Sequence, residues 1–202
     1  MVRPKYIVVL GPDGSGKTTV ADCLATELRA EGRAVTRRDF SFGIMPPISR
    51  LLRRRQRDSA PEGQPDSGMV KPLNPGRAAI LACWYGIDHL MGRWQLRRGS
   101  PGELVIFARS YHDFLYQRAY LRLPVAIPRF FLAFGPKPHM VVTPLQDPQV
   151  IHDRKPELTV AEIAEQYARI AHRFARYPYF SSIDASGGVR LTVRRIREHL
   201  NL

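Results

Sequence analysis

Residues 5–19 have the sequence KYIVVLGPDGSGKTT, and they carry the clearest signal of the fold class in the chain. Lys5 to Leu10 is a continuous apolar run rich in β-branched residues, which is typical of a strand buried on both faces of a parallel sheet. A glycine-rich turn follows, and the apolar spacing from Gly16 to Ala30 predicts a helix. A buried strand, a glycine-rich turn and a helix together indicate the first unit of a parallel α/β sheet.

The glycine-rich turn matches the pattern G-x-x-x-x-G-K-[ST] at every fixed position, from Gly11 to Thr18. In such a loop the backbone N–H groups point inward at phosphate oxygens, and the helix N-terminus adds partial positive charge. Lys17 would reach the β- and γ-phosphates of ATP, and the Thr18 hydroxyl would be a ligand of Mg²⁺. The residues expected to contact the triphosphate are Gly11, Gly14, Ser15, Gly16, Lys17, Thr18 and Thr19.

The rest of the chain alternates between strand and helix patterns. Further strands are predicted at 34–40, 103–108, 139–143 and 179–184. Helices are predicted at 49–57, 77–97, 124–134, 159–177 and 189–200. This alternation predicts one α/β domain over residues 1–202 with a five-stranded parallel sheet flanked by helices, and the glycine-rich loop makes it a P-loop NTPase fold. The stretch from Ser59 to Gly76 is rich in proline and glycine and predicts a long surface loop or a mobile segment.

The chain is strongly basic, with a formal net charge of +13, which points to anionic partners. Five arginines fall between Arg50 and Arg57. This run could contact nucleic acid or an acidic membrane surface, or cover an acceptor site, but a solvated basic helix is the favoured interpretation. The N-terminal apolar run is too short for a signal peptide, and Cys23 and Cys83 suggest small core residues rather than a disulfide framework. A cytoplasmic protein is therefore expected.

Asp13 is an unusual residue for a phosphate-binding turn, because a carboxylate repels bound phosphates. It could hold a magnesium-bound water or an acceptor hydroxyl, and the alternative is an exposed turn residue. No Asn-Lys-x-Asp guanine-binding motif is present, which argues against a GTPase.

The form Gly-x-Asp-Gly-x-Gly-Lys-Thr-Thr, residues 11–19, resembles the phosphate loop of the thymidylate kinase family of nucleoside monophosphate kinases. That resemblance implies the kinase-type strand order 2-3-1-4-5 for the predicted sheet. It also implies that Asp13 lies near the sugar of the acceptor nucleotide. Arg109 ends a predicted strand and is followed by Tyr116 and Gln117, as in the family, so Arg109 resembles the arginine that binds the acceptor phosphate. Residues 152–158 stand where these kinases carry a short lid, and Arg154 there resembles the arginine that closes over the transferring phosphoryl group.

The chain departs from the family pattern at the magnesium site. Ala108 stands where the family has an acidic residue, and the apolar run at 139–143 is not followed by one either. Magnesium would then depend on Thr18 and water, with Asp13 or Asp113 as a further candidate ligand.

Two further departures concern the acceptor. Asp88, on the flank of an apolar helix face, is followed by His89 where the family has an arginine that reads the base. Asp88 could line an acceptor pocket, or it could be a half-buried residue bonded to the backbone. Arg38 and Asp39, at the end of the second predicted strand, are also candidates to face the acceptor.

These residues predict ATP-dependent phosphoryl transfer to a small acceptor, with a nucleoside monophosphate favoured by the resemblance. Lys17, Asp13, Arg109 and Arg154 are the residues expected to act in that reaction. The alternatives are a kinase of a nucleoside, sugar or other small alcohol, a non-catalytic nucleotide-binding protein, and a polyanion-stimulated ATPase. Formation of a homodimer is a further expectation about partners.

Overall fold

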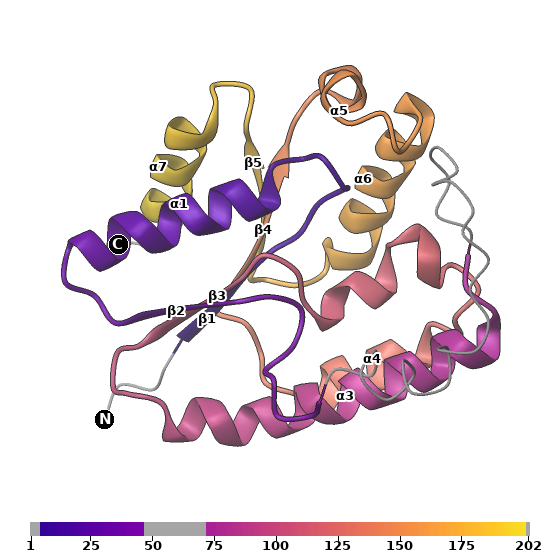
Figure 1. Cartoon of the computed structure of the whole chain (residues 1–202), viewed down its shortest axis with the longest axis horizontal. Coiled ribbons are helices and arrows are strands. Elements are labelled where there is room, and N and C mark those ends of the chain that lie inside the picture. The colour runs from indigo at the N-terminus through magenta and orange to yellow at the C-terminus, as the bar shows by residue number, and fades with distance from the viewer. Residues whose placement is uncertain (1–4, 47–71, 201–202) are drawn as a thin grey trace, which may run out of the picture.

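The computed structural model describes residues 5–46 and 72–200. Its centre is a parallel sheet of five strands in the order β2-β3-β1-β4-β5 (Figure 1), so the predicted fold class and strand order are confirmed. The strands are β1 Lys5–Val9, β2 Val35–Arg38, β3 Leu104–Phe107, β4 Met140–Leu145 and β5 Phe180–Asp184.

Helices cover both faces of the sheet. Figure 1 shows α1 and α7 on one side and α3 and α4 on the other, and the side chains of α6 pack into the core on the α3 side. The helices are α1 Lys17–Ala30, α3 Pro75–Arg98, α4 Ala126–Phe134, α5 Pro148–Arg154, α6 Val160–Phe174 and α7 Val189–Leu200, with short 3₁₀ helices η1 Tyr111–Leu115 and η2 Arg118–Tyr120.

The central strand β1 explains why its sequence is apolar at successive positions. Ile7 and Val9 pack in the core beneath α1 and α7, whereas Tyr6 and Val8 pack in the core beneath α3 and α6. Since β1 lies between β3 and β4, the turn that follows it emerges at the middle of the carboxyl edge of the sheet. Parallel α/β sheets bind ligands at this edge.

The structure corrects several expectations about element boundaries. Helix α3 begins at Pro75, inside the stretch predicted as a loop. Proline is favoured in the first turn of a helix, and the Asn74 side chain caps this end by accepting a hydrogen bond from Gly76 N. Helix α5 was not expected, and its last turn includes the first residues of the predicted 152–158 segment. Cys83, expected in the core, is exposed. The predicted helix at 49–57 lies outside the described residues, as does most of the predicted loop at 59–76.

Other local predictions are confirmed. Thr159 and Glu162 form the reciprocal capping box that begins α6, and α7 has its predicted limits. Among residues 5–46 and 72–200, no helix combines the length and apolar character needed to cross a membrane.

Candidate active site

The phosphate loop joins β1 to α1 and has the backbone conformation of an anion-binding turn. Gly14 and Gly16 have φ values of 89° and 80°, in the left-handed region that side chains with a Cβ rarely adopt. Gly16 is the N-cap of α1, and Lys17 is its first residue. The free N–H groups at this end of α1 can therefore be donated to phosphate oxygens.

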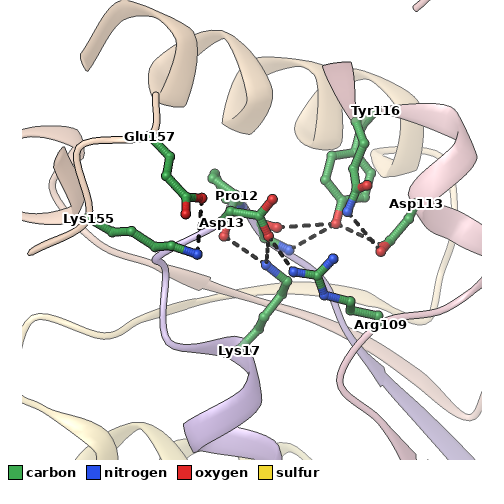
Figure 2. Close-up of polar contacts among 10 residues, drawn as sticks. Pro12, Asp13, Lys17, Arg109, Asp113, Tyr116, Lys155 and Glu157 are labelled. Atoms are coloured by element: carbon green, nitrogen blue, oxygen red, sulfur yellow. Dashed lines mark hydrogen bonds and ion pairs between the residues drawn. The ribbon is translucent and has the colours of Figure 1, made fainter. Parts of the chain in front are cut away.

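Lys17 is almost fully buried at the base of this loop. Its Nζ lies 2.9 Å from Asp13 Oδ1 and donates to the carbonyl oxygen of Pro12 at 3.0 Å. Figure 2 shows the ammonium group below the loop, between Asp13 and the start of α1. The ammonium group therefore already points into the loop, and both of its contacts are with loop atoms.

Arg109 reaches the same carboxylate from a different part of the chain. It follows β3, which pairs with β1 in parallel register, so the carboxyl ends of the two strands lie side by side. Its Nη2 lies 2.8 Å from Asp13 Oδ1, the oxygen that Lys17 also contacts, and its side chain is 43% exposed. Two cations thus converge on one oxygen of Asp13, and Arg109 keeps a surface free to meet a ligand.

The electrostatic state of Asp13 follows from these neighbours. Burial alone would raise the pKa of this carboxyl group, but Lys17, with weaker contributions from Arg109 and Lys155, lowers the pKa of Asp13 below its ordinary value. Asp13 is therefore ionised at neutral pH. Its negative charge offsets the positive charges of Lys17 and Arg109 as long as no phosphate is bound.

A second carboxylate, Asp113, lies fully buried in η1 beside the loop. Its Oδ1 accepts from the Tyr116 hydroxyl at 2.9 Å, and its Oδ2 accepts from Gln117 Nε2 at 2.9 Å. Burial raises the pKa of Asp113 to about 6, although the charge of Lys17 opposes this rise. Tyr116 also receives a hydrogen bond from Gly11 N at 3.3 Å, 105 residues away in the chain. This chain of contacts ties η1 to the first residue of the phosphate loop.

Sequence reasoning named Asp113 only as a possible magnesium ligand and Tyr116 only as part of a resemblance. The signal that could have found their connection is weak, because it depends on η1 turning the Tyr116 hydroxyl back toward β1. Ser110 begins this turn, accepting a hydrogen bond from His112 N at 3.2 Å.

The remaining loop residues differ in their exposure. Ser15 is buried against Gly11, whereas Thr18 and Thr19 in the first turn of α1 are exposed. A magnesium ion bound to a nucleotide usually takes one or two protein oxygens and completes its shell with phosphates and water. The Thr18 hydroxyl and the second oxygen of Asp13 are hard oxygen donors of this kind. In the parts of the chain that the structure describes, no cluster of three or more His, Cys, Asp or Glu side chains could hold a metal by itself. These residues fit a magnesium ion that arrives with the phosphates.

The segment after α5 packs against the phosphate loop. A Cβ placed on Gly14 would lie 3.1 Å from Ile151 Cγ2 and 3.3 Å from Lys155 Cβ, so this end of α5 touches the loop. Arg154, the arginine predicted to act here, is the exposed last residue of α5. Lys155, which sequence reasoning did not single out, is the residue in contact with the loop.

Two predicted acceptor residues, Arg38 and Asp39, are engaged elsewhere. Arg38 Nη1 donates to the carbonyl oxygen of Phe42 at 2.5 Å, and its side chain lines a pocket of about 240 Å³ between β2, β3 and the end of α3. Asp39 is exposed and forms an ion pair with Arg37. Neither contact involves Asp13 or Arg109.

Asp88 corresponds to the alternative that sequence reasoning had left open. Its side chain is 1% exposed, and its two oxygens accept hydrogen bonds from three backbone N–H groups of the segment after β2. The donors are Phe42 N at 2.6 Å, Ile44 N at 2.7 Å and Met45 N at 2.9 Å. Asp88 thus anchors residues 42–45 to α3 instead of facing an open acceptor pocket.

Comparison with known proteins supports the fold of the chain, and it does not by itself identify an activity. No protein-family model matches the chain, and no curated protein matches it in sequence. Among solved structures, thymidylate kinase from Candida albicans matches with a TM-score of 0.62 and 16% sequence identity. The match covers 98% of this chain and 92% of that enzyme, whose structure is described as revealing the origin of broad substrate specificity. The chain therefore has a thymidylate kinase-like fold.

Proposed function

We propose that this protein transfers the γ-phosphoryl group of ATP to a small acceptor, with a nucleoside monophosphate as the favoured acceptor. The observation that carries the proposal is the convergence of Lys17 and Arg109 on Asp13. One cation comes from the phosphate loop and the other from the neighbouring strand end. Phosphoryl transfer spreads negative charge over the oxygens between donor and acceptor, and cations arranged on both sides of that position stabilise it.

Lys17 and the N–H groups of Gly14 to Thr18 would bind the β- and γ-phosphates. Bound phosphates would take Lys17 from its contacts with Asp13 and Pro12. An acceptor oxygen would then form a bond to the γ-phosphorus while the bond to the β–γ bridging oxygen breaks, with its electron pair leaving on ADP. Charged hydrogen bonds from Lys17 and Arg109 favour this loose, negatively charged arrangement.

Magnesium fits this site through Thr18 and Asp13, as the donor atoms above indicate. When bound, it would neutralise phosphate charge and orient the β- and γ-oxygens. Ala108, the residue directly after β3, offers no carboxylate for this purpose. Asp113 is bonded through both oxygens to Tyr116 and Gln117, so we assign it a positioning role.

Arg109 favours a phosphate as the acceptor group over an alcohol. A phosphate oxygen is already ionised and needs no base, but its charge must be neutralised, which a partly exposed guanidinium can do in a bidentate manner. An alcohol would require a base. Asp13 is a weak one because its neighbours lower its pKa, and both oxygens of Asp113 are already bonded to Tyr116 and Gln117. A nucleoside or sugar kinase remains the alternative that a substrate panel decides.

The experiment is a transfer assay with ATP, Mg²⁺ and separate acceptors, namely each nucleoside monophosphate, each nucleoside and common sugars. The proposal expects ADP and a phosphorylated nucleotide in equal amounts. A phosphorylated nucleoside or sugar would select the alternative. ATP binding without any product would indicate the non-catalytic protein, and ADP release stimulated by polyanions alone would indicate the ATPase.

The exposed face of α3 suggests a homodimer as a further part of this proposal. Ile80, Ile87, Met91 and Trp94 are between 37% and 63% exposed. They lie opposite the small residues Ala78 and Ala82 that α3 buries. The spacing of 7, 4 and 3 residues is that of a helix-packing seam. Sedimentation velocity would show a dimer that Ile87→Glu dissociates, while a monomer at micromolar concentration would remove this expectation.

A further inference from the structure

The residue that touches the phosphate loop from the segment after α5 is Lys155. Its backbone N donates to the carbonyl oxygens of Ile151 at 2.9 Å and His152 at 3.1 Å, so its position at the end of α5 is fixed. The next turn is closed by a hydrogen bond between His152 Nδ1 and the carbonyl oxygen of Leu158 at 2.7 Å. Lys155 therefore projects from an ordered part of the chain.

The contact with the loop is close because the loop residue is a glycine. Lys155 lies one helical turn after Ile151, and both side chains pack on Gly14, where no side chain intervenes. Figure 2 shows the Lys155 side chain extending toward the loop, with its ammonium group on the same side of the site as Asp13 and Lys17. Its charge contributes to the lowered pKa of Asp13, which places it within electrostatic reach of the loop.

The ammonium group is held by a neighbouring carboxylate and not by the core. Lys155 Nζ lies 3.0 Å from Glu157 Oε2, and the two side chains are 45% and 51% exposed. Exposed ion pairs of this kind are weak, so a phosphate group can displace the carboxylate. Arg154 is the sequence neighbour of Lys155, but it has no contact with the loop among those described for residues 5–46 and 72–200.

We infer that Lys155, and not Arg154, is the cation that this segment supplies to the γ-phosphate, and that Glu157 holds its ammonium group beside the phosphate loop until a triphosphate displaces it. The inference rests on the proposed function, because it requires a nucleoside triphosphate in the loop. It assigns a residue that the likeness to known kinases did not indicate. It also adds a competitor for that residue, since Glu157 and the γ-phosphate would bind the same ammonium group.

Binding can test this assignment without turnover. Isothermal titration calorimetry would compare the β,γ-methylene analogue of ATP with ADP, both with Mg²⁺ and without an acceptor. Lys155→Met should weaken binding of the triphosphate analogue about tenfold, the usual effect of losing one charged hydrogen bond, while changing ADP affinity less than about twofold. Arg154→Met, the matched control, should leave both affinities unchanged. Glu157→Gln should tighten binding of the analogue about threefold, because the ammonium group is released from its ion pair.

Three results with variants that change affinity would overturn the inference. The first is a selective loss of triphosphate affinity in Arg154→Met but not in Lys155→Met. The second is an equal loss for ADP and the analogue in Lys155→Met. The third is weaker binding of the analogue by Glu157→Gln. Failure of the unsubstituted protein to bind the analogue would overturn the proposed function, and this inference with it. Normal binding by that protein together with an unaffected Lys155→Met variant would overturn the inference alone.

Discussion

Arg109 Nη2 and Asp13 Oδ1 meet at 2.8 Å, although the two residues are 96 positions apart in the chain. The contact exists because β1 and β3 are parallel neighbours whose carboxyl ends lie side by side. Lys17 Nζ reaches the same oxygen at 2.9 Å. Asp13 therefore joins the cation expected to bind the donor phosphates to the cation expected to bind the acceptor.

Replacing Asp13 with asparagine tests this joining role. Asp13→Asn keeps the shape of the side chain but removes the charge that holds Lys17 and Arg109 in place. We expect the turnover number to fall at least about tenfold, because the transferred group loses its pre-set partners. Affinity for a triphosphate analogue measured without Mg²⁺ should be equal or higher, since the site becomes more positive. Steady-state kinetics and calorimetry measure these two quantities, and an unchanged turnover number would contradict the role.

Arg109→Met should act on the acceptor and spare the donor. Without the guanidinium, kcat/KM for the acceptor should fall about a hundredfold, the loss expected for one bidentate charged contact. The affinity for the triphosphate analogue should change less than about threefold. Arg129→Met, an exposed arginine on α4, is the matched control and should change neither value. If Arg109→Met instead lost affinity for the triphosphate analogue and kept its kcat/KM for the acceptor, Arg109 would bind the donor and the prediction would be wrong.

Asp113 should make the stability of the protein depend on pH in a predictable direction. Its pKa in the folded chain is raised to about 6 from an ordinary value near 3.8, so the folded state binds a proton more strongly than the unfolded state. Its contribution to stability is therefore complete below about pH 4 and is lost as the pH rises through 6. Between pH 7 and pH 5 the unsubstituted protein should gain about 1 kcal/mol of unfolding free energy relative to Asp113→Asn.

Urea denaturation of both proteins at the two pH values measures that difference. Taking the difference between the proteins removes the effect of other groups, such as His89, whose pKa burial lowers to about 3. A difference of the opposite sign would show that Asp113 is ionised more readily in the folded chain than its burial implies.

Asp88→Ala should lower the stability of the folded protein and should not selectively weaken binding of the acceptor. The change leaves the N–H groups of Phe42, Ile44 and Met45 without their acceptor, and the free energy of unfolding should fall by roughly 3 kcal/mol. Asp88→Asn, which keeps one acceptor oxygen, should cost less. Chemical denaturation measures both effects. A variant with unchanged stability that no longer binds the acceptor would show that Asp88 lines the acceptor pocket.

The part of the fold that could be predicted from sequence is the part with local signals. The apolar run of β1, the glycines of the phosphate loop and the capping box of α6 each depend on a few neighbouring residues, and the structure shows all three. The strand order was predicted from the resemblance to kinases, and the structure confirms it.

The parts that could not be predicted depend on contacts between distant segments. The local pattern around Asp88 fits a pocket residue and a backbone anchor equally well, and only the path of residues 42–45 decides between them. Likewise, Arg154 and Lys155 are adjacent cations in the sequence, and the packing of α5 on Gly14 is what separates them. The link from Asp113 through Tyr116 to Gly11 arises in the same way, from the 3₁₀ turn of η1.

Phosphorus NMR of the unsubstituted protein with ATP, Mg²⁺ and a mixture of nucleoside monophosphates would detect the proposed phosphoryl transfer directly. Lys17→Ala serves as the matched variant, because Lys17 is the cation assigned to the donor phosphates. We expect ADP and a nucleoside diphosphate to appear in equal amounts with the unsubstituted protein, and we expect Lys17→Ala to form them at least about a hundredfold more slowly. ATP that remains intact, or ADP formed with inorganic phosphate and no phosphorylated nucleotide, would contradict the proposed transfer.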